Sequence, residues 1–235
     1  MFDVSKMQLE QMIFEVRFEH AFLYWDNSGK IFKEILKGWP TATVETVTTQ
    51  EAKVIVNIKD DDLTLMFSPK HINFNQSSPS GIKAMGEFAD YTLPIITKHL
   101  DVNIFSRIGN RYIYMYKVDD VQASVALLQK TGFFSIPADK FAKIGTSLNN
   151  PVIKFTAVRD DDIGYTFNMA YVSRNLEIKA PKLVKCDASA FITNGLLVDI
   201  DFHTLKQVEG GNVRVQELLK KNKKDIEYFI GELLG

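Results

Sequence analysis

Cysteine is almost absent from this 235-residue chain, which contains one, Cys186. A lone thiol cannot form an intramolecular disulfide or supply a multi-cysteine metal cluster. The chain also lacks the apolar run of roughly 18 residues that a membrane-spanning helix needs. Its first residues are polar and acidic where a signal peptide needs a basic start. We therefore expect a cytoplasmic protein that does not partner with a membrane.

An excess of charge of one sign is missing as well. The 28 Lys and Arg residues nearly balance the 29 Asp and Glu residues, so net charge does not indicate binding to nucleic acid. The sequence has no Gly-x-Ser-x-Gly elbow, phosphate loop, dinucleotide-binding glycine motif or His-Glu-x-x-His motif. These absences argue against an enzyme, although they do not decide the question, and we predict no cofactor and no metal.

The sequence does contain an internal resemblance. The segments 59–67 and 159–167 align at an offset of one hundred positions, and each carries three consecutive aspartates between stretches of alternating apolar residues. This pattern predicts two β-hairpins with aspartate-rich turns. At the same offset, segment 14–18 matches segment 114–118, and each precedes a predicted helix. The chain therefore reads as an internal duplication.

Helical periodicity and capping signals predict four helices, at 28–36, 82–100, 120–130 and 213–234. Ser28 is the expected N-cap of the first helix, and Pro94 is a candidate kink in the second. The last helix carries a long apolar stripe that includes Ile226 and Phe229, which we expect to close the core of the second half. An extra strand is predicted at 195–202, as an insertion in the second half.

The predicted fold class is α+β, with two tandem β-α-β-β-β-α pseudo-repeats, antiparallel sheets and helices packed on one face. Alternation of apolar and polar residues with a period of two favours antiparallel sheets over a buried parallel one. We place the first unit at residues 1–105 and the second, with its inserted strand and C-terminal helix, at residues 106–235.

Three short strand-like motifs carry a resemblance to a known family. They are E-V-R-F at 15–18, R-I-G-x-R-Y-I at 107–113 and L-L-x-D-I-D at 196–201, followed by an amphipathic helix. Together they resemble a sporadically distributed, uncharacterised prokaryotic protein family that shares these motifs. The resemblance implies a common fold and a patchy, accessory-gene distribution. Such a distribution hints at a bacterial defence or conflict system, for example against phage.

Asp199, Asp201 and His203 alternate with apolar residues, so a strand would direct all three side chains to one face. Two carboxylates and an imidazole are suitable ligands for a divalent metal, which makes these residues the candidate catalytic set. The competing interpretation, which we favour, is the solvated face of a half-buried sheet, because the sequence offers no spaced partner such as a second histidine.

Glu15, Arg17 and Glu19 form a similar polar face, and Arg107 and Arg111 lie near the start of the matching strand of the second half. If these strands are neighbours, the arginines can pair with Glu15 and the strand aspartates in a charge network across the sheet, which is the favoured interpretation. The alternative is a site for a carboxylate or phosphate ligand formed by Arg107, Arg111, Glu15 and Arg17.

Other polar features are interpreted as structural. The aspartate triplets lack the glycine and terminal glutamate of a calcium loop, and the basic run at 220–224 reads as a solvated helix face. Cys186 lies beside two lysines without a convincing base. The isolated histidines, which we expect to be structural, are His20, His71 and His99.

These observations leave three functional hypotheses. The first is a non-catalytic interaction or sensing component whose partner is a protein, either another copy of the chain or a different protein. The second is a metal-dependent hydrolase or nuclease that uses Asp199, Asp201 and His203. The third is a binder of small anionic ligands in a groove between the two units, using Arg107 and Arg111.

Overall fold

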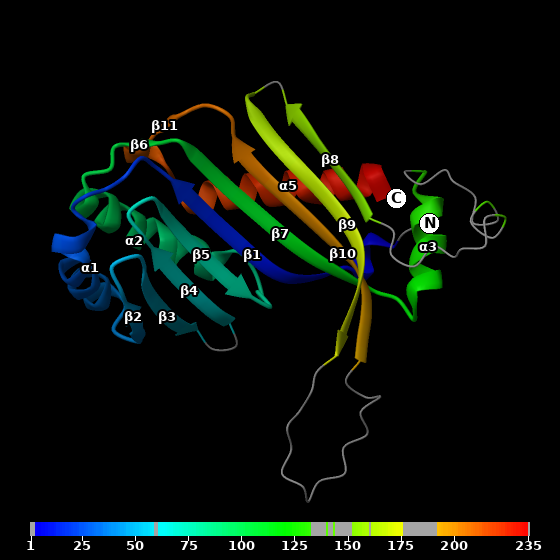
Figure 1. The fold of residues 1–235 in the computed structure, drawn as a ribbon, viewed down its shortest axis with the longest axis horizontal. Coiled ribbons are helices and arrows are strands. Elements are labelled where there is room, and N and C mark those ends of the chain that lie inside the picture. The colour runs from blue at the N-terminus through cyan, green and yellow to red at the C-terminus, as the bar shows by residue number, and fades with distance from the viewer. Residues whose placement is uncertain are drawn as a thin grey trace, which may run out of the picture.

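The computed structural model describes residues 3–58, 61–132, 140, 143, 152–159, 161–175 and 192–234, and in these residues the chain has an α+β fold (Figure 1). The α-helices are α1 (Tyr24–Gly38), α2 (Lys83–Leu100), α3 (Val121–Lys130) and α5 (Val215–Leu234). Nine strands form one antiparallel sheet: β1 (Gln8–Arg17), β2 (Ala42–Val47), β3 (Ala52–Ile58), β4 (Asp61–Phe67), β5 (His71–Ser77), β7 (Arg107–Lys117), β8 (Val152–Arg159), β9 (Ile163–Asn175) and β10 (Ile192–Thr204).

The smaller elements connect these helices and strands. A second sheet pairs β6 (Ile104–Phe105) with β11 (Val208–Glu209), so that the start of β7 is tied to the segment after β10. Single turns of 3₁₀-helix lie at η1 (Val4–Lys6) and η3 (Gly210–Asn212).

The large sheet has the order β2-β3-β4-β5-β1-β7-β10-β9-β8. Both predicted hairpins are present, as β3–β4 and β8–β9, and strands β1 and β7 pair at the centre of the sheet. The strand predicted at 195–202 is part of β10, which lies beside β7 as β5 lies beside β1. The predicted unit has three strands between its helices, whereas the first half has four, β2 to β5. The prediction that the strand at 195–202 is an insertion of the second half is wrong, because the first half also has a strand, β5, between its hairpin and its last helix.

The two faces of the sheet differ in chemistry because side chains alternate along each strand. On β1, Met12, Phe14 and Val16 are fully buried, whereas Glu15 and Arg17 point to the other side. The register pairs Phe14 with Phe74 of β5, so the apolar set continues across strands. We call the apolar side the helix face and the polar side the open face.

Three helices, α1, α2 and α5, cover the helix face of the sheet (Figure 1). Aromatic rings contribute to the contact that each helix makes. Phe32 of α1 lies 5.4 Å from Phe67 of β4, measured between ring centroids. Phe88 of α2 packs edge-on against Phe74 of β5 at 6.0 Å. On the other half of the sheet, Phe229 of α5 lies 6.0 Å from a ring of β9 and completes the same buried layer.

The helix ends agree with the predictions in one case and differ in another. Asp120 caps α3 by accepting a hydrogen bond from the backbone N–H of Ala123 at 2.8 Å. The prediction that Ser28 caps the first helix is wrong, because α1 begins at Tyr24 and Ser28 lies inside it. Tyr24 is buried and its hydroxyl donates to the carbonyl of Thr48, which holds the earlier turn in the helix.

Helix α5 lies along α2, and a carboxylate of α2 caps its start. Asp90 accepts hydrogen bonds from the backbone N–H groups of Val215 at 2.7 Å and Gln216 at 3.3 Å. The predicted apolar stripe is buried at Ile226 and half-buried at Phe229. In the part of the chain that the structure describes, no helix combines the length and the apolarity that crossing a membrane requires.

Candidate functional site

The open face places the sequence-predicted site residues on three neighbouring strands. Glu15 and Arg17 come from β1, Arg107 and Arg111 from β7, and the acidic set from β10. The register pairs Asp201 with Arg111 and Glu15 with Gly109, so these side chains share one face at the centre of the sheet. We call this set the charge network; its members are Glu15, Arg17, Arg107, Arg111, Asp199, Asp201 and His203.

Arg107 joins the first half of the sheet to the second. Its Nη1 atom donates to Glu15 Oε1 at 3.1 Å, and its Nη2 atom donates to Asp201 Oδ2 at 2.6 Å. Gly109 leaves room for this guanidinium, because a Cβ atom at position 109 would collide with it. Arg17 adds a further bond to Glu15 at 2.6 Å. The side chain of Arg107 is only 21% exposed, so these bonds are partly shielded from solvent.

Arg111 and Asp199 form a second pair with two parallel hydrogen bonds. Arg111 Nε donates to one carboxylate oxygen at 2.7 Å and Nη2 donates to the other at 2.6 Å. This hydrogen bonding to Asp199 raises the pKa of Arg111. Burial raises the pKa of Asp201 even though the charge of Arg107 acts in the opposite direction.

The charge network therefore has the pairing that the sequence analysis favours. Both strand aspartates are occupied by guanidinium groups, and His203 Nδ1 lies 3.9 Å from Asp201 Oδ2, beyond hydrogen-bond distance. Within the described ranges, no group of three or more His, Cys, Asp or Glu side chains is arranged to hold a metal ion. The same pairing engages the arginines that an anionic ligand would need.

The remaining sequence candidates also fall into structural roles where the structure describes them. Asp161 pairs with Arg159 through two bonds of 2.6 and 2.7 Å, and Asp162 pairs with Lys206 at 2.6 Å. In the basic run of α5, Lys221 lies 3.7 Å from Asp161. Cys186 lies outside the described residues. Of the histidines, His71 contacts a serine hydroxyl, His99 lies beside a glutamate and His20 belongs to an aromatic cluster.

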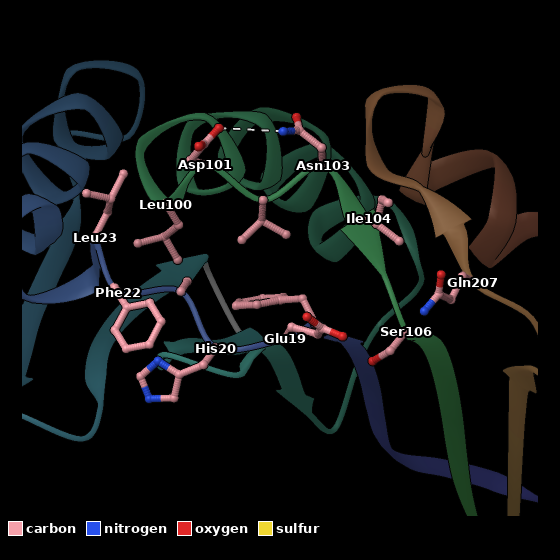
Figure 2. Close-up of a pocket in the computed structure, with 13 residues that line it drawn as sticks. Glu19, His20, Phe22, Leu23, Leu100, Asp101, Asn103, Ile104, Ser106 and Gln207 are labelled. Atoms are coloured by element: carbon pink, nitrogen blue, oxygen red, sulfur yellow. Dashed lines mark hydrogen bonds between the residues drawn. The ribbon is translucent and has the colours of Figure 1, made fainter.

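A groove of about 490 Å³ lies at the end of the sheet where β1 stops (Figure 2). Its lining residues Phe18 and Ser106 are the chain neighbours of Arg17 and Arg107, so the groove begins where the charge network ends. One wall is the segment 18–23, which connects β1 to α1. The other is the segment 100–106, which connects α2 to β7, and Gln207 closes one end. Phe18, Ala21, Leu100 and Val102 supply apolar surface, whereas Glu19, Asp101, Asn103, Ser106 and Gln207 are polar.

Backbone hydrogen bonds fix the wall at 18–23. The N–H groups of Phe18 and Ala21 donate to the carbonyls of Lys70 and Pro69, at 3.1 and 2.7 Å, so the segment is tied to the β4–β5 turn. Buried Tyr24 then starts α1 directly after the wall. The exposed side chains of this segment therefore project from a backbone held in place.

The wall at 100–106 is fixed by the end of α2. Asp101 takes a left-handed conformation with φ of 55°, which aspartate tolerates better than most residues. Its N–H and that of Val102 donate back to carbonyls in the last turn of α2, at 3.4 and 2.9 Å. The N–H of Ser106 donates to the carbonyl of Arg17 at 2.8 Å, which joins this wall to the end of β1.

Three rings form an exposed aromatic cluster beside the groove: His20, Phe22 and Trp25. The imidazole of His20 stacks on Trp25 at 5.4 Å and lies 4.7 Å from the ring of Phe22. The indole N–H of Trp25 donates to the carbonyl of Thr49 at 3.0 Å, which fixes the ring. Phe22 is 73% exposed and Trp25 is 48% exposed. Exposed apolar surface of this kind, next to a concave groove, is typical of a binding site.

Sequence reasoning does not find this groove, because its walls lie in loops about 80 residues apart with no periodic pattern. One feature of the sequence does point to an exposed apolar surface near the start of α1. Five consecutive apolar or aromatic residues run from Ala21 to Trp25, more than one buried helix face can accommodate. The structure buries Ala21 and Tyr24 and exposes the other three.

Comparison with known proteins does not indicate a family for this chain. Neither the scan against protein-family models nor the search of curated proteins gives a match for the chain. The resemblance to the sporadically distributed prokaryotic family, and the defence context at which it hints, therefore stay predictions.

Proposed function

We propose that this protein is a non-catalytic binding component that holds a protein partner in the groove at the end of its sheet. The groove and the aromatic cluster form one continuous candidate surface, which we call the groove site. The exposure of Phe22 beside the groove is the observation that carries the proposal. Because the Phe22 ring is 73% exposed, its burial against a partner would contribute favourable free energy to binding.

Two further features support a binding role. Aromatic residues dominate the binding energy of many protein interfaces, and Trp25 is held in position before any partner arrives. Because the backbone of both walls is hydrogen-bonded, little ordering is required on binding. The carboxylates of the charge network, in contrast, are neutralised by arginines and leave little capacity for metal-dependent hydrolysis.

Site-specific photo-crosslinking tests this proposal. A benzophenone amino acid placed at position 22 should give a defined protein adduct when the full chain is irradiated in its native cells. Position 228 is a matched control, because Tyr228 of α5 is 72% exposed, almost the same as Phe22. The absence of an adduct from position 22, or identical adducts from both positions, would contradict the proposal.

We also propose that the two halves descend from one β-α-β-β-β-α unit by duplication. The strand order supports this, since β1-β5-β4-β3 on one side of the centre corresponds to β7-β10-β9-β8 on the other. Each half also ends in a long helix, α2 or α5, and these two helices pack together. In a crystal structure, residues 11–100 should superpose on residues 111–235 with both hairpins overlaid; unrelated paths would contradict the duplication.

A further inference from the structure

We infer that the groove site takes a basic, amphipathic protein segment in which a lysine or arginine lies next to large apolar residues. This inference rests on the proposed binding function and names the chemistry of the partner. Its basis is the combination of unpaired negative charge and exposed aromatic surface at one place in the fold.

The side chains that line the groove include two carboxylates and, among the described residues, neither lysine nor arginine. Glu19 and Asp101 are the two carboxylates among its lining residues, and both are exposed. Across the ranges that the structure describes, neither has a basic side chain within ion-pair distance, whereas the carboxylates of the charge network are paired. His20 is the one lining residue able to carry a positive charge. A cationic group on the partner would find complementary charge here.

The second carboxylate comes from the end of α2. The helix terminates at Leu100, and both Leu100 and the C-cap residue, Asp101, line the groove. The preceding carbonyls of the last turn accept hydrogen bonds within the protein and Lys98 lies in the same turn, so the negative charge here is that of the Asp101 side chain. Among the described residues, the side chain of Asp101 accepts one hydrogen bond, a long one of 3.5 Å from the side-chain amide of Asn103, drawn as a dashed line in Figure 2.

The aromatic cluster favours the same partner chemistry. The faces of Phe22 and Trp25 attract cations, and this attraction adds to the burial of apolar surface. Ile104 is 54% exposed on the opposite wall, so large apolar side chains border the groove on both sides. A segment that crosses the groove would contact both walls.

The shape favours a protein segment over an enclosed small molecule. Small-molecule sites usually bury most of their ligand. Here Phe22 and Ile104 stand largely in solvent at the rims, where an enclosed ligand would leave them exposed. A segment that carries apolar side chains on both sides of a basic residue covers the rims and fills the groove.

Peptide selection tests this inference on the full chain. Random dodecapeptides displayed on phage are selected on the immobilised wild-type protein, and the dissociation constants of the enriched peptides are measured in solution. We expect the enriched sequences to share Lys or Arg next to Phe, Trp, Leu, Ile or Met. Their affinity should fall as salt concentration rises, because screening weakens the attraction to Glu19 and Asp101.

Three variants separate the contributions. Glu19→Gln combined with Asp101→Asn should weaken binding by about two- to fivefold per carboxylate; asparagine also tolerates the left-handed backbone at position 101. Phe22→Ser should weaken binding by about 30-fold or more, the loss typical of a central aromatic contact. Tyr228→Ser, on a surface far from the groove lining, should leave binding unchanged.

The outcomes distinguish the partner chemistry from the binding function. Acidic or uncharged enriched sequences that still depend on Phe22 would overturn the inference about charge and leave the groove as the binding site. Failure to enrich any common sequence, or enriched peptides that bind Phe22→Ser as tightly as wild type, would overturn both. Preserved affinity in the Glu19 and Asp101 double variant would overturn the assignment of these carboxylates.

Discussion

Both the open face and the groove site contain carboxylates, but among the described residues only those of the open face have arginine partners. On the open face, each strand aspartate holds an arginine at 2.6 Å. In the groove, Glu19 and Asp101 are unpaired among the described residues, and Phe22 stands in water. A cluster of charged residues is therefore a poor sign of function when its members satisfy one another. Unsatisfied groups held on a fixed backbone are the better sign.

In the proposed account, the charge network stabilises the fold and the groove site binds the partner. Substitutions in the charge network should change the free energy of unfolding and leave peptide binding intact. Substitutions in the groove site should do the reverse. The following predictions run from the largest expected change in stability to the smallest.

Arg107→Ala should lower the free energy of unfolding by about 2 to 3 kcal/mol, because it leaves two partly buried carboxylates, Glu15 and Asp201, without their shared partner. Urea denaturation of the purified variant measures the change. Arg174→Ala is a matched control, since Arg174 pairs with Glu10 at 2.8 Å but is 51% exposed, and it should cost less than about 1 kcal/mol. Equal losses of unfolding free energy in Arg107→Ala and Arg174→Ala would show that the charge network stabilises the fold no more than an exposed ion pair does.

The pair of Arg111 and Asp199 should show a smaller coupling, of about 1 kcal/mol, because the arginine side chain is 46% exposed and solvent screens the interaction. A double-mutant cycle with Arg111→Gln and Asp199→Asn measures it. Additive effects of the two substitutions would mean that the two hydrogen bonds contribute nothing to folding.

Asp201 should make stability depend on pH in an identifiable direction. Burial raises its pKa above the ordinary value of 3.8, so the folded state binds this proton more tightly than the unfolded state. Its contribution is fully present below pH 3.8 and is lost as the pH rises through the raised pKa of the folded state. We therefore expect the free energy of unfolding of wild type, relative to that of Asp201→Asn, to fall as the pH rises from 3.8 through the raised pKa. Urea denaturation at a series of pH values measures this difference. A rise would reverse the assignment.

Phe22→Ser should have the smallest effect on folding, within about 0.5 kcal/mol, because the ring is already exposed. The melting temperature should be indistinguishable from that of Tyr228→Ser. A large destabilisation would show that Phe22 supports the fold, and the groove site would then lose its central residue.

Much of the fold follows from local patterns in the sequence. Both hairpins are readable because apolar residues alternate on either side of an aspartate triplet, although Asp61 and Asp62 of the first triplet lie in β4 and pair with β3. Strand β5 is harder to predict, because Asn73 and Asn75 are unusual in strands and Gln76 is fully buried where the alternation expects an apolar residue. Helix α1 starts earlier than predicted because the buried ring of Tyr24 outweighs the cap signal of Ser28.

The charge network and the proposed groove site are less predictable than the fold. Alternation indicates that Asp199 and Asp201 share a face, and a central position for their strand suggests an arginine partner. Which arginine meets which aspartate depends on strand register, a property that no single segment contains. The groove depends on two loops brought together by the sheet, so its chemistry appears only when segments 18–23 and 100–106 lie side by side.

The location of binding is the central claim, and amide chemical-shift mapping by NMR tests it most directly. Adding a peptide selected on the wild-type protein should shift the amide signals of residues 18–25 and 100–106, and leave those of Arg111, Asp199 and Asp201 in place. In a titration of Phe22→Ser, the same shifts should yield a dissociation constant about 30-fold higher or more, in line with the loss expected for this contact. Shifts centred on Arg111 and Asp199, with the groove unaffected, would contradict the account and make the charge network the binding site.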